Sequence, residues 1–346
     1  MDLQQFYRTD LLVENEEMVR HQTEKEKKIL DETSGVEIEE KREGQIIITD
    51  ITIDEEAEQR IGKKAGHYIT LSAPTLAPYE EELFANLIQQ CMQQVQKLAE
   101  KHVPLKDGKI LIIGLGNREV TPDAVGPLLM DELKKEIPTY YSEEQSELIV
   151  YAPGVTIQTG LETAEFVEAI VQKTNADLLI VVDALAARDA NRLCRTIQLT
   201  DTGIHPGSGV GNHRKELSTE TLGIPVLALG IPTVVDGPVF VADAIDTMFQ
   251  YLASKIGETN NPSSLLSVTP WLRNEHKEVD LSVLKPIFGD WSTWPHDERI
   301  QLFEEALQHH NLKTFISPKE IDAWVMLYSQ FLAEGFNELL SKVKNK

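Results

Sequence analysis

The chain has 346 residues, of which 41% are hydrophobic, and a formal net charge of −23 at pH 7. This hydrophobic share can build a sizeable core, which excludes a globally disordered protein. The strong negative charge argues against nucleic acid and anionic membranes as partners, because like charges repel. The two cysteines, Cys91 and Cys194, lie in no CxxC or Cys/His cluster, so we expect neither a zinc site nor a disulfide framework.

The N-terminal part of the chain is dominated by charge. Its first ten residues, MDLQQFYRTD, lack the basic start and apolar run of a signal peptide. No apolar stretch reaches the roughly 18 residues that span a membrane. Residues 11–43 are rich in Glu and Lys and are predicted to be exposed or loosely ordered. We therefore expect a cytoplasmic protein with an N-terminal extension.

Strand and helix signals alternate through the rest of the chain. Apolar and β-branched runs predict strands at 45–54, 67–74, 109–117, 147–153, 177–185, 195–201 and 224–232. Apolar residues at helical spacing predict helices at 79–101, 124–136, 161–174, 238–256, 297–309 and 318–343. This alternation predicts an α/β fold with a mostly parallel central sheet and helices on both faces.

The expected domain organisation follows from the same pattern. Residues 11–257 are expected to form the α/β domain together with its N-terminal extension. The linker-like segment ETNNPSS begins at Glu258, and residues 258–346 are expected to form a helical C-terminal part packed on that domain.

The first chemical candidate is the loop after the predicted strand 109–117. In GLGNREVTPDAVGP (114–127), Glu119 occupies the position of the third glycine of a dinucleotide-binding fingerprint, so that fingerprint fails. Asn117 ends the predicted strand and is a candidate substrate-binding residue, and Asp123 lies just before the predicted helix. Asp123 could simply cap this helix, or it could serve a site at the carboxyl edge of the sheet.

The second candidate is Asp183, which follows an apolar strand in VVDALAAR (181–188). A carboxylate at the end of a buried strand is costly to desolvate unless it has a partner or a function. It could be a cap or an ion-pair partner of Arg188. Together with Asp123, however, it predicts two carboxylates at one edge of the sheet. Such a pair tends to share a proton, so that one acts as general base and the other as general acid on a water molecule.

The third candidate is the glycine-rich segment HPGSGVGNHRKE (205–216), whose main-chain N–H groups could approach a substrate carbonyl or an anion. It could equally be a flexible surface loop. Neither a serine elbow nor the HExxH motif of zinc proteases is present, and we expect no metal or cofactor. The candidate substrate-binding residues of this segment are His205, Gly207, Ser208, Gly209, His213 and Arg214.

Five segments in this order resemble the germination protease family of spore-forming Bacillus-type bacteria. They are YRTDLLVE (7–14), IIGLGNREVTPDAVGP (112–127), VVDALAAR (181–188), HPGSGVGNHRKE (205–216) and LGIPTVVD (229–236). The resemblance implies an atypical aspartic endopeptidase whose essential aspartates correspond to Asp123 and Asp183. Its implied substrates are the small acid-soluble spore proteins, degraded during germination in the spore core after their release from DNA.

The resemblance also implies how the enzyme is made. The family is produced as an inactive homotetrameric zymogen, and the match to YRTDLLVE implies that residues 1–10 are a propeptide removed by cleavage between Asp10 and Leu11. The implied fold is similar to that of hydrogenase maturation endopeptidases, which use acidic residues and a histidine around nickel.

Two other function classes stay open. One is a metal-dependent maturation-type endopeptidase, or a nucleoside-phosphorylase-like hydrolase, on a similar sheet. The other is a binding protein, without catalytic activity, whose glycine-rich segment holds an anionic ligand. Sensitivity to chelators would favour the first, and a failure to produce fragments from a spore protein would favour the second.

Overall fold

The computed structural model describes most of the chain. The described residues are 35–61, 63–136, 148–154, 162–206, 215–259, 279–308 and 314–344. Several predicted site residues lie outside these stretches, and what the sequence predicts for them stays a prediction. They are Asp10, Leu11, Gly207, Ser208, Gly209, His213 and Arg214.

The strands belong to one sheet in which neighbours are ordered β1-β2-β3-β7-β8-β6-β4-β5, and β9 pairs with β8. The strands are β1 (Val36–Glu43), β2 (Ile46–Ile53), β3 (Gly66–Ser72), β4 (Ile110–Gly114), β5 (Leu148–Tyr151), β6 (Leu178–Ala187), β7 (Thr196–Thr200), β8 (Val226–Asp236) and β9 (Phe315–Ile316).

The longer helices are α4 (Glu81–His102), α5 (Val125–Glu136), α7 (Thr163–Thr174), α9 (Gly237–Thr259), α11 (His296–Gln308) and α12 (Ile321–Lys344). Shorter helices and turns complete the described elements. They are α3 (Glu55–Ile61), α8 (Thr219–Leu222), α10 (Lys285–Phe288), η2 (Thr121–Asp123), η3 (Ala190–Arg192), η6 (Leu281–Leu284) and η7 (Gly289–Thr293).

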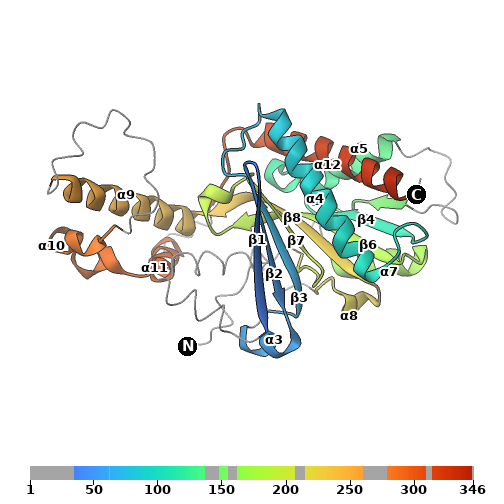
Figure 1. Cartoon of the computed structure of the whole chain (residues 1–346), viewed down its shortest axis with the longest axis horizontal. Helices are drawn as coiled ribbons and strands as arrows, with labels where there is room; N and C mark the ends of the chain where they lie inside the picture. The colour runs from blue at the N-terminus through green and yellow to red at the C-terminus, as the bar shows by residue number, and fades with distance from the viewer. Residues whose placement is uncertain are drawn as a thin grey trace. The chain divides into compact units, whose positions relative to one another are not determined.

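The α/β class predicted from the sequence is confirmed, and the sheet is mixed. Strand β4 pairs in parallel with both β5 and β6. The pairs β1–β2, β2–β3, β3–β7 and β7–β8 are antiparallel, and Figure 1 shows β1, β2 and β3 side by side. Apolar runs indicate where strands lie but not their direction. The sequence therefore predicted a mostly parallel sheet, whereas several neighbouring strands pair antiparallel.

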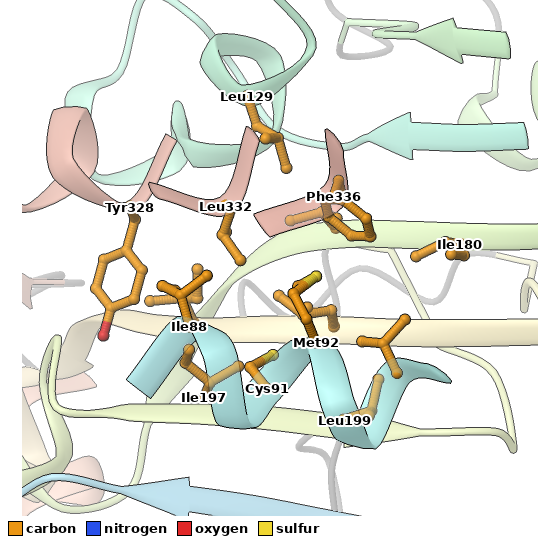
Figure 2. Packing of buried hydrophobic residues seen from close by; sticks show 14 of the residues in the cluster. Ile88, Cys91, Met92, Leu129, Ile180, Ile197, Leu199, Tyr328, Leu332 and Phe336 are labelled. Atoms are coloured by element: carbon orange, nitrogen blue, oxygen red, sulfur yellow. The ribbon is translucent and has the colours of Figure 1, made fainter. Parts of the chain in front are cut away.

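Hydrophobic clusters on both faces of the sheet hold the helices in place. On one face, α4, α5 and α12 pack over alternate residues of β4, β6, β7 and β8. Figure 2 shows Ile88, Cys91 and Met92 of α4 facing Leu332 and Phe336 of α12 above the sheet. On the other face, α7 packs over the intervening residues of β4 and β6. Helices therefore cover both faces, as the alternation of elements predicts.

The chain divides into two compact units. The first holds the described residues up to Ala187, then Asn191–Val234 and the chain from Ser317 on; the second holds Arg188–Ala190 and Val235–Ile316. This division differs from the expected one at residue 258, because α12 packs against α4 and α5 in the first unit. The second unit has its own small core around Phe249, Ala253 and Leu284.

Two local differences from the sequence-based elements concern strands. Strand β1 lies within the segment expected to be exposed or loosely ordered; nearly all its side chains are exposed, so it lacks the apolar alternation of a half-buried strand. Strand β6 runs to Ala187, so Asp183 lies inside this strand and not at its end. No helix of the described residues is long and apolar enough to cross a membrane.

Candidate active site

Asp123 is held at the end of η2, a short 3₁₀ turn between β4 and α5. Pro122 stands in the first turn, where its fixed φ suits the start of a helix. The Asp123 N–H donates to the carbonyl of Val120 at 2.8 Å, and the Ala124 N–H donates to the carbonyl of Thr121 at 3.1 Å. Asp123 is half-buried, and its carboxylate therefore lies between the protein and solvent.

The carboxylate of Asp123 turns back toward the end of β4. Its Oδ2 accepts a hydrogen bond from the main-chain N–H of Asn117 at 2.7 Å. An N–H donor stabilises the ionised form of a carboxylate. Gly116 has a φ of +113°, and a Cβ there would lie 2.0 Å from the main-chain oxygen of Asp123. The turn after β4 and the Asp123 backbone are thus in direct contact, which only glycine permits at position 116.

Asp183 lies where β6 extends beyond the end of its neighbour β4. Gly114, the last residue of β4, pairs with Val182, and the Leu115 N–H donates to the Val182 carbonyl at 2.8 Å. Asp183 is therefore the first residue of β6 beyond the carboxyl end of β4. Its side chain is 6% exposed, and its Oδ1 accepts from the Ala184 N–H at 2.9 Å. The expectation that Asp183 ends its own strand is wrong, because β6 continues to Ala187.

The elements that carry the two aspartates are neighbours. Residues of η2 lie within 8 Å of residues of β6, measured between Cα atoms. The loop that contains Asn117 joins β4 to η2, so Asn117, Asp123 and Asp183 belong to one region at the carboxyl end of β4. This is the edge where open α/β sheets place their sites.

The glycine-rich segment begins and ends on the face of the sheet to which Asp183 belongs. Ile204 and Leu217 exchange main-chain hydrogen bonds of 2.9 and 2.8 Å and close the segment. Both pack in the same cluster as Val181 and Leu185, the residues two before and two after Asp183 on β6. Because side chains alternate along a strand, Asp183 shares that face.

The described ends of this segment are tied by polar contacts. The Lys215 N–H donates to Glu162 at 3.0 Å, and its ammonium group donates to Glu168 of α7 at 2.7 Å. His205 is half exposed, with its Nε2 3.6 Å from Glu216, which also binds Lys64 at 2.9 Å. Thus His205 lies beside an ion pair.

Sequence reasoning did not identify the role of Gly116 or the main-chain bond from Asn117. A hydrogen bond from the backbone leaves no residue-type signature, but the GLGN spacing at the end of an apolar strand was a signal of close main-chain approach. Among the described residues, no group of three or more His, Cys, Asp and Glu side chains is arranged to hold a metal ion.

The chain is similar to known proteins along nearly its whole length. A family model described as "Germination protease" matches residues 12–346. The chain is 37% identical to the germination protease of Bacillus thuringiensis subsp. konkukian, over 98% of this chain and 95% of that protein. The germination protease of Bacillus cereus has the same identity and coverage. That of Bacillus anthracis is 36% identical, again over 98% of this chain and 95% of that protein.

Among solved structures, a NiFe hydrogenase maturation protease, HycI from Thermococcus kodakarensis, is 19% identical with a TM-score of 0.27, over 38% of this chain and 78% of that chain. That likeness is too low to inform the site. The matches along the whole sequence are sufficient by themselves: the chain belongs to the germination protease family and is a peptide hydrolase.

Proposed function

We propose that this chain is an endopeptidase that starts the degradation of small acid-soluble spore proteins during germination, with Asp123 and Asp183 activating a water molecule between them. The observation that carries the proposal is the proximity of η2 to β6 at the point where β4 ends. Membership of the germination protease family supports the substrate class, since the family name places the proteolysis at germination.

The environments of the two carboxylates support different roles. Asp123 is half-buried and accepts a main-chain N–H bond of 2.7 Å, which favours its ionised form. Asp183 also accepts a main-chain N–H, from Ala184 at 2.9 Å, but it is only 6% exposed, and burial disfavours a charge. In this proposal Asp123 is the general base and Asp183 holds the shared proton as the general acid.

The chemistry then follows in two balanced steps. Asp123 takes a proton from water while the water oxygen bonds to the scissile carbonyl carbon, and Asp183 donates its proton to the carbonyl oxygen. In the second step the carbon–nitrogen bond breaks. Asp123 passes its proton to the leaving amine, and the new hydroxyl returns a proton to Asp183. The products are a carboxyl and an amino terminus, and both side chains regain their starting protonation.

We also propose that residues 1–10 form a propeptide that the enzyme itself removes between Asp10 and Leu11, that the enzyme is a homotetramer, and that it acts in the cytoplasm of the forespore and spore core. The glycine-rich segment is proposed to bind substrate next to the aspartates. The position of Ile204 and Leu217 on the face of Asp183 supports that role. Its proposed contacts are His205, Gly207, Ser208, Gly209, His213 and Arg214, with Asn117 beside Asp123.

The dyad is tested by replacing each aspartate with its neutral isostere. Asp123→Asn and Asp183→Asn are each expected to reduce cleavage of a small acid-soluble spore protein by a factor on the order of 10³ or more, because neither amide can exchange the proton. Self-cleavage should be lost together with substrate cleavage. Fragments are followed by electrophoresis and mass spectrometry, and the fold by circular dichroism.

The matched control is Asp177→Asn, which changes an aspartate just before the amino end of β6. It accepts a hydrogen bond from the Lys109 N–H at 2.8 Å, which an amide oxygen can still accept, so activity should persist. Full activity in a folded Asp123→Asn or Asp183→Asn variant would remove the dyad from the proposal. A loss of wild-type activity on adding a chelator would favour the metal-dependent alternative.

A further inference from the structure

Asn117 sits in a turn in which its side chain and its carbonyl both accept hydrogen bonds from nearby main-chain N–H groups. Its side-chain Oδ1 accepts from the Glu119 N–H at 3.0 Å, and its carbonyl accepts from the Val120 N–H at 3.1 Å. The first of these is the hydrogen bond of an Asx turn, in which an Asn or Asp side chain replaces a main-chain acceptor. The two hydrogen bonds constrain the backbone from Asn117 to Val120.

The same turn aims the N–H of Asn117 at Asp123. That N–H donates to Asp123 Oδ2 at 2.7 Å, the short end of the range for a charge-assisted bond. A peptide N–H cannot be replaced by mutation of its side chain, but its direction depends on the turn. The side-chain amide of Asn117 and the carboxylate of Asp123 are therefore linked through the backbone that joins them.

We propose that Asn117 is a positioning residue for the hydrolytic reaction: through its Asx turn it directs its own main-chain N–H at Asp123 and keeps that carboxylate ionised and oriented as the general base. This inference rests on the proposed role of Asp123. It adds a role to the sequence-based prediction that Asn117 is a substrate-binding candidate, with Oδ1 engaged by the Glu119 N–H.

If Asn117 positions the general base, its replacement should shift the pH dependence of kcat/KM, which the loss of a purely structural residue would not do. Loss of an N–H donor destabilises the ionised carboxylate and raises its pKa. The acidic limb of kcat/KM, which reports the general base of the free enzyme, should then move to higher pH. The midpoint of this limb does not depend on how much enzyme has become active, so slow self-processing of a variant would not alter it.

Two substitutions break the Asx hydrogen bond from opposite ends. Asn117→Ala removes the acceptor, and Glu119→Pro removes the donor while leaving Asn117 in place. In the full-length chain each should lower kcat about tenfold, change KM by less than about twofold, and raise the midpoint of the acidic limb by about half to one pH unit. The readout is the pH profile of hydrolysis of a small acid-soluble spore protein, or of whichever polypeptide the wild-type chain cleaves.

Two further variants serve as controls. Asn117→Ser keeps a side-chain acceptor at the same position and should return the midpoint toward that of wild type. Glu119→Gln keeps the N–H donor and removes an exposed negative charge, so any shift in its midpoint should be downward. Thermal unfolding of each variant separates altered chemistry from a lost fold.

The outcomes distinguish this inference from the proposed function. If Asp123→Asn is inactive but Asn117→Ala and Glu119→Pro keep the wild-type midpoint and kcat, the role of Asn117 is refuted and the dyad stands. If Asn117→Ser is as defective as Asn117→Ala, the Asx turn is not what matters. If folded Asp123→Asn is fully active, the dyad itself fails. If one variant does not fold, the other tests the same hydrogen bond.

Discussion

Gly116 lies so close to the backbone of Asp123, the proposed general base, that a side chain at position 116 would displace it. Its φ of +113° is unfavourable for residues with a side chain, and a Cβ would lie 2.0 Å from the Asp123 carbonyl oxygen and 3.1 Å from its Oδ1. Two residues earlier, a Cβ on Gly114 would lie 2.1 Å from the carbonyl oxygen of Gly126 in α5. The end of β4 and the start of α5 therefore meet through main chain, and Gly116 lies against the backbone of Asp123.

Gly116→Ala tests whether this contact sets the position of Asp123. The methyl group cannot be accommodated without displacing the Asp123 backbone, so cleavage should fall about 10²-fold. The free energy of unfolding should fall by about 1–3 kcal/mol, from backbone strain and overpacking together. Activity assays and urea unfolding of the same preparation measure the two effects.

Gly44→Ala is the matched control for the cost of placing a side chain on a residue with positive φ. Gly44 also has a positive φ, +61°, but no atom lies within 4 Å of a Cβ built there. It should cost about 1 kcal/mol of stability and leave cleavage unchanged, since only the left-handed conformation is penalised. Equal activity of Gly116→Ala and Gly44→Ala would show that close approach at Gly116 does not position Asp123.

Single residues also mark how far the sequence could predict the site. The positions of Asp123 and Asp183 relative to apolar runs predicted that their elements would meet, because parallel neighbours bring their carboxyl ends to one edge. The hydrogen bond from the Asn117 N–H and the contact at Gly116 were not predictable in detail. Both involve main-chain atoms, whose partners depend on the folded path of the loop and not on residue type.

At the scale of elements, the sequence predicted the strands formed by longer apolar or alternating runs and missed β1 and the two-residue strand β9. Strand β4 is buried at all five positions and was evident as an apolar run. Strand β1 is an edge strand with charged side chains, a composition that blunts edge-to-edge pairing but hides the strand signal. The extension of β6 past Asp183 was partly missed because its last residues become less buried.

In the second unit, α9 and α11 are joined by a polar cluster around His296. Its Nδ1 lies 2.5 Å from Asp246 Oδ2, and its Nε2 lies 3.4 Å from Asp243 Oδ1. Arg299 of α11 also pairs with Asp246. Asp243 Oδ2 accepts from the Ala190 N–H at 2.9 Å. A cluster of ionisable groups therefore links these helices to the segment that follows β6.

This cluster predicts a pH-dependent contribution to stability. Burial raises the pKa of Asp243 to about 6 from its ordinary value of 3.8; the Asp189 carboxylate acts in the same direction, while the Ala190 N–H and His296 oppose it. A raised pKa in the folded state means that stability is fully present below about pH 4 and is lost as pH rises through about 6. Asp243→Asn should remove that loss.

The measurement compares melting temperatures of wild type and Asp243→Asn between pH 4 and pH 7. The melting temperature of the variant should rise relative to that of wild type as pH increases, by roughly 2–4 °C between pH 4 and pH 7. Hydrogen–deuterium exchange of α9 and α11 should show slower exchange in the variant than in wild type at pH 7. Glu298→Gln, an exposed change on α11, is the control and should show no such trend. A difference between Asp243→Asn and wild type that is constant with pH would contradict the prediction.

At the scale of the whole molecule, composition excluded a globally disordered chain but did not predict its division into units. A net charge of −23 argues against nucleic acid as a partner, because like charges repel. The linker-like segment after residue 257 suggested a boundary there, yet α12 belongs with the sheet. Its apolar stripe, including Tyr328 and Leu332, packs in the main core. An amphipathic helix does not specify from sequence alone which surface it covers.

Removal of the proposed propeptide is expected to change the activity of the entire chain. If residues 1–10 restrain the enzyme, a chain that begins at Leu11 should cleave a small acid-soluble spore protein at once, whereas the full-length chain should show a lag that ends as it is shortened. The reason is that a restraint covalently attached to the enzyme acts at a high effective concentration until it is cut.

The assay follows substrate fragments and the mass of the enzyme in the same samples. Asp123→Asn serves as the control in both forms: full length, it should stay uncut, and beginning at Leu11, it should stay inactive. Cleavage of the full-length Asp123→Asn chain by added wild-type enzyme would indicate processing between molecules. A folded chain beginning at Leu11 that lacks activity, or a full-length chain that is active without a lag, would contradict the restraint, because in either case activity would not depend on residues 1–10.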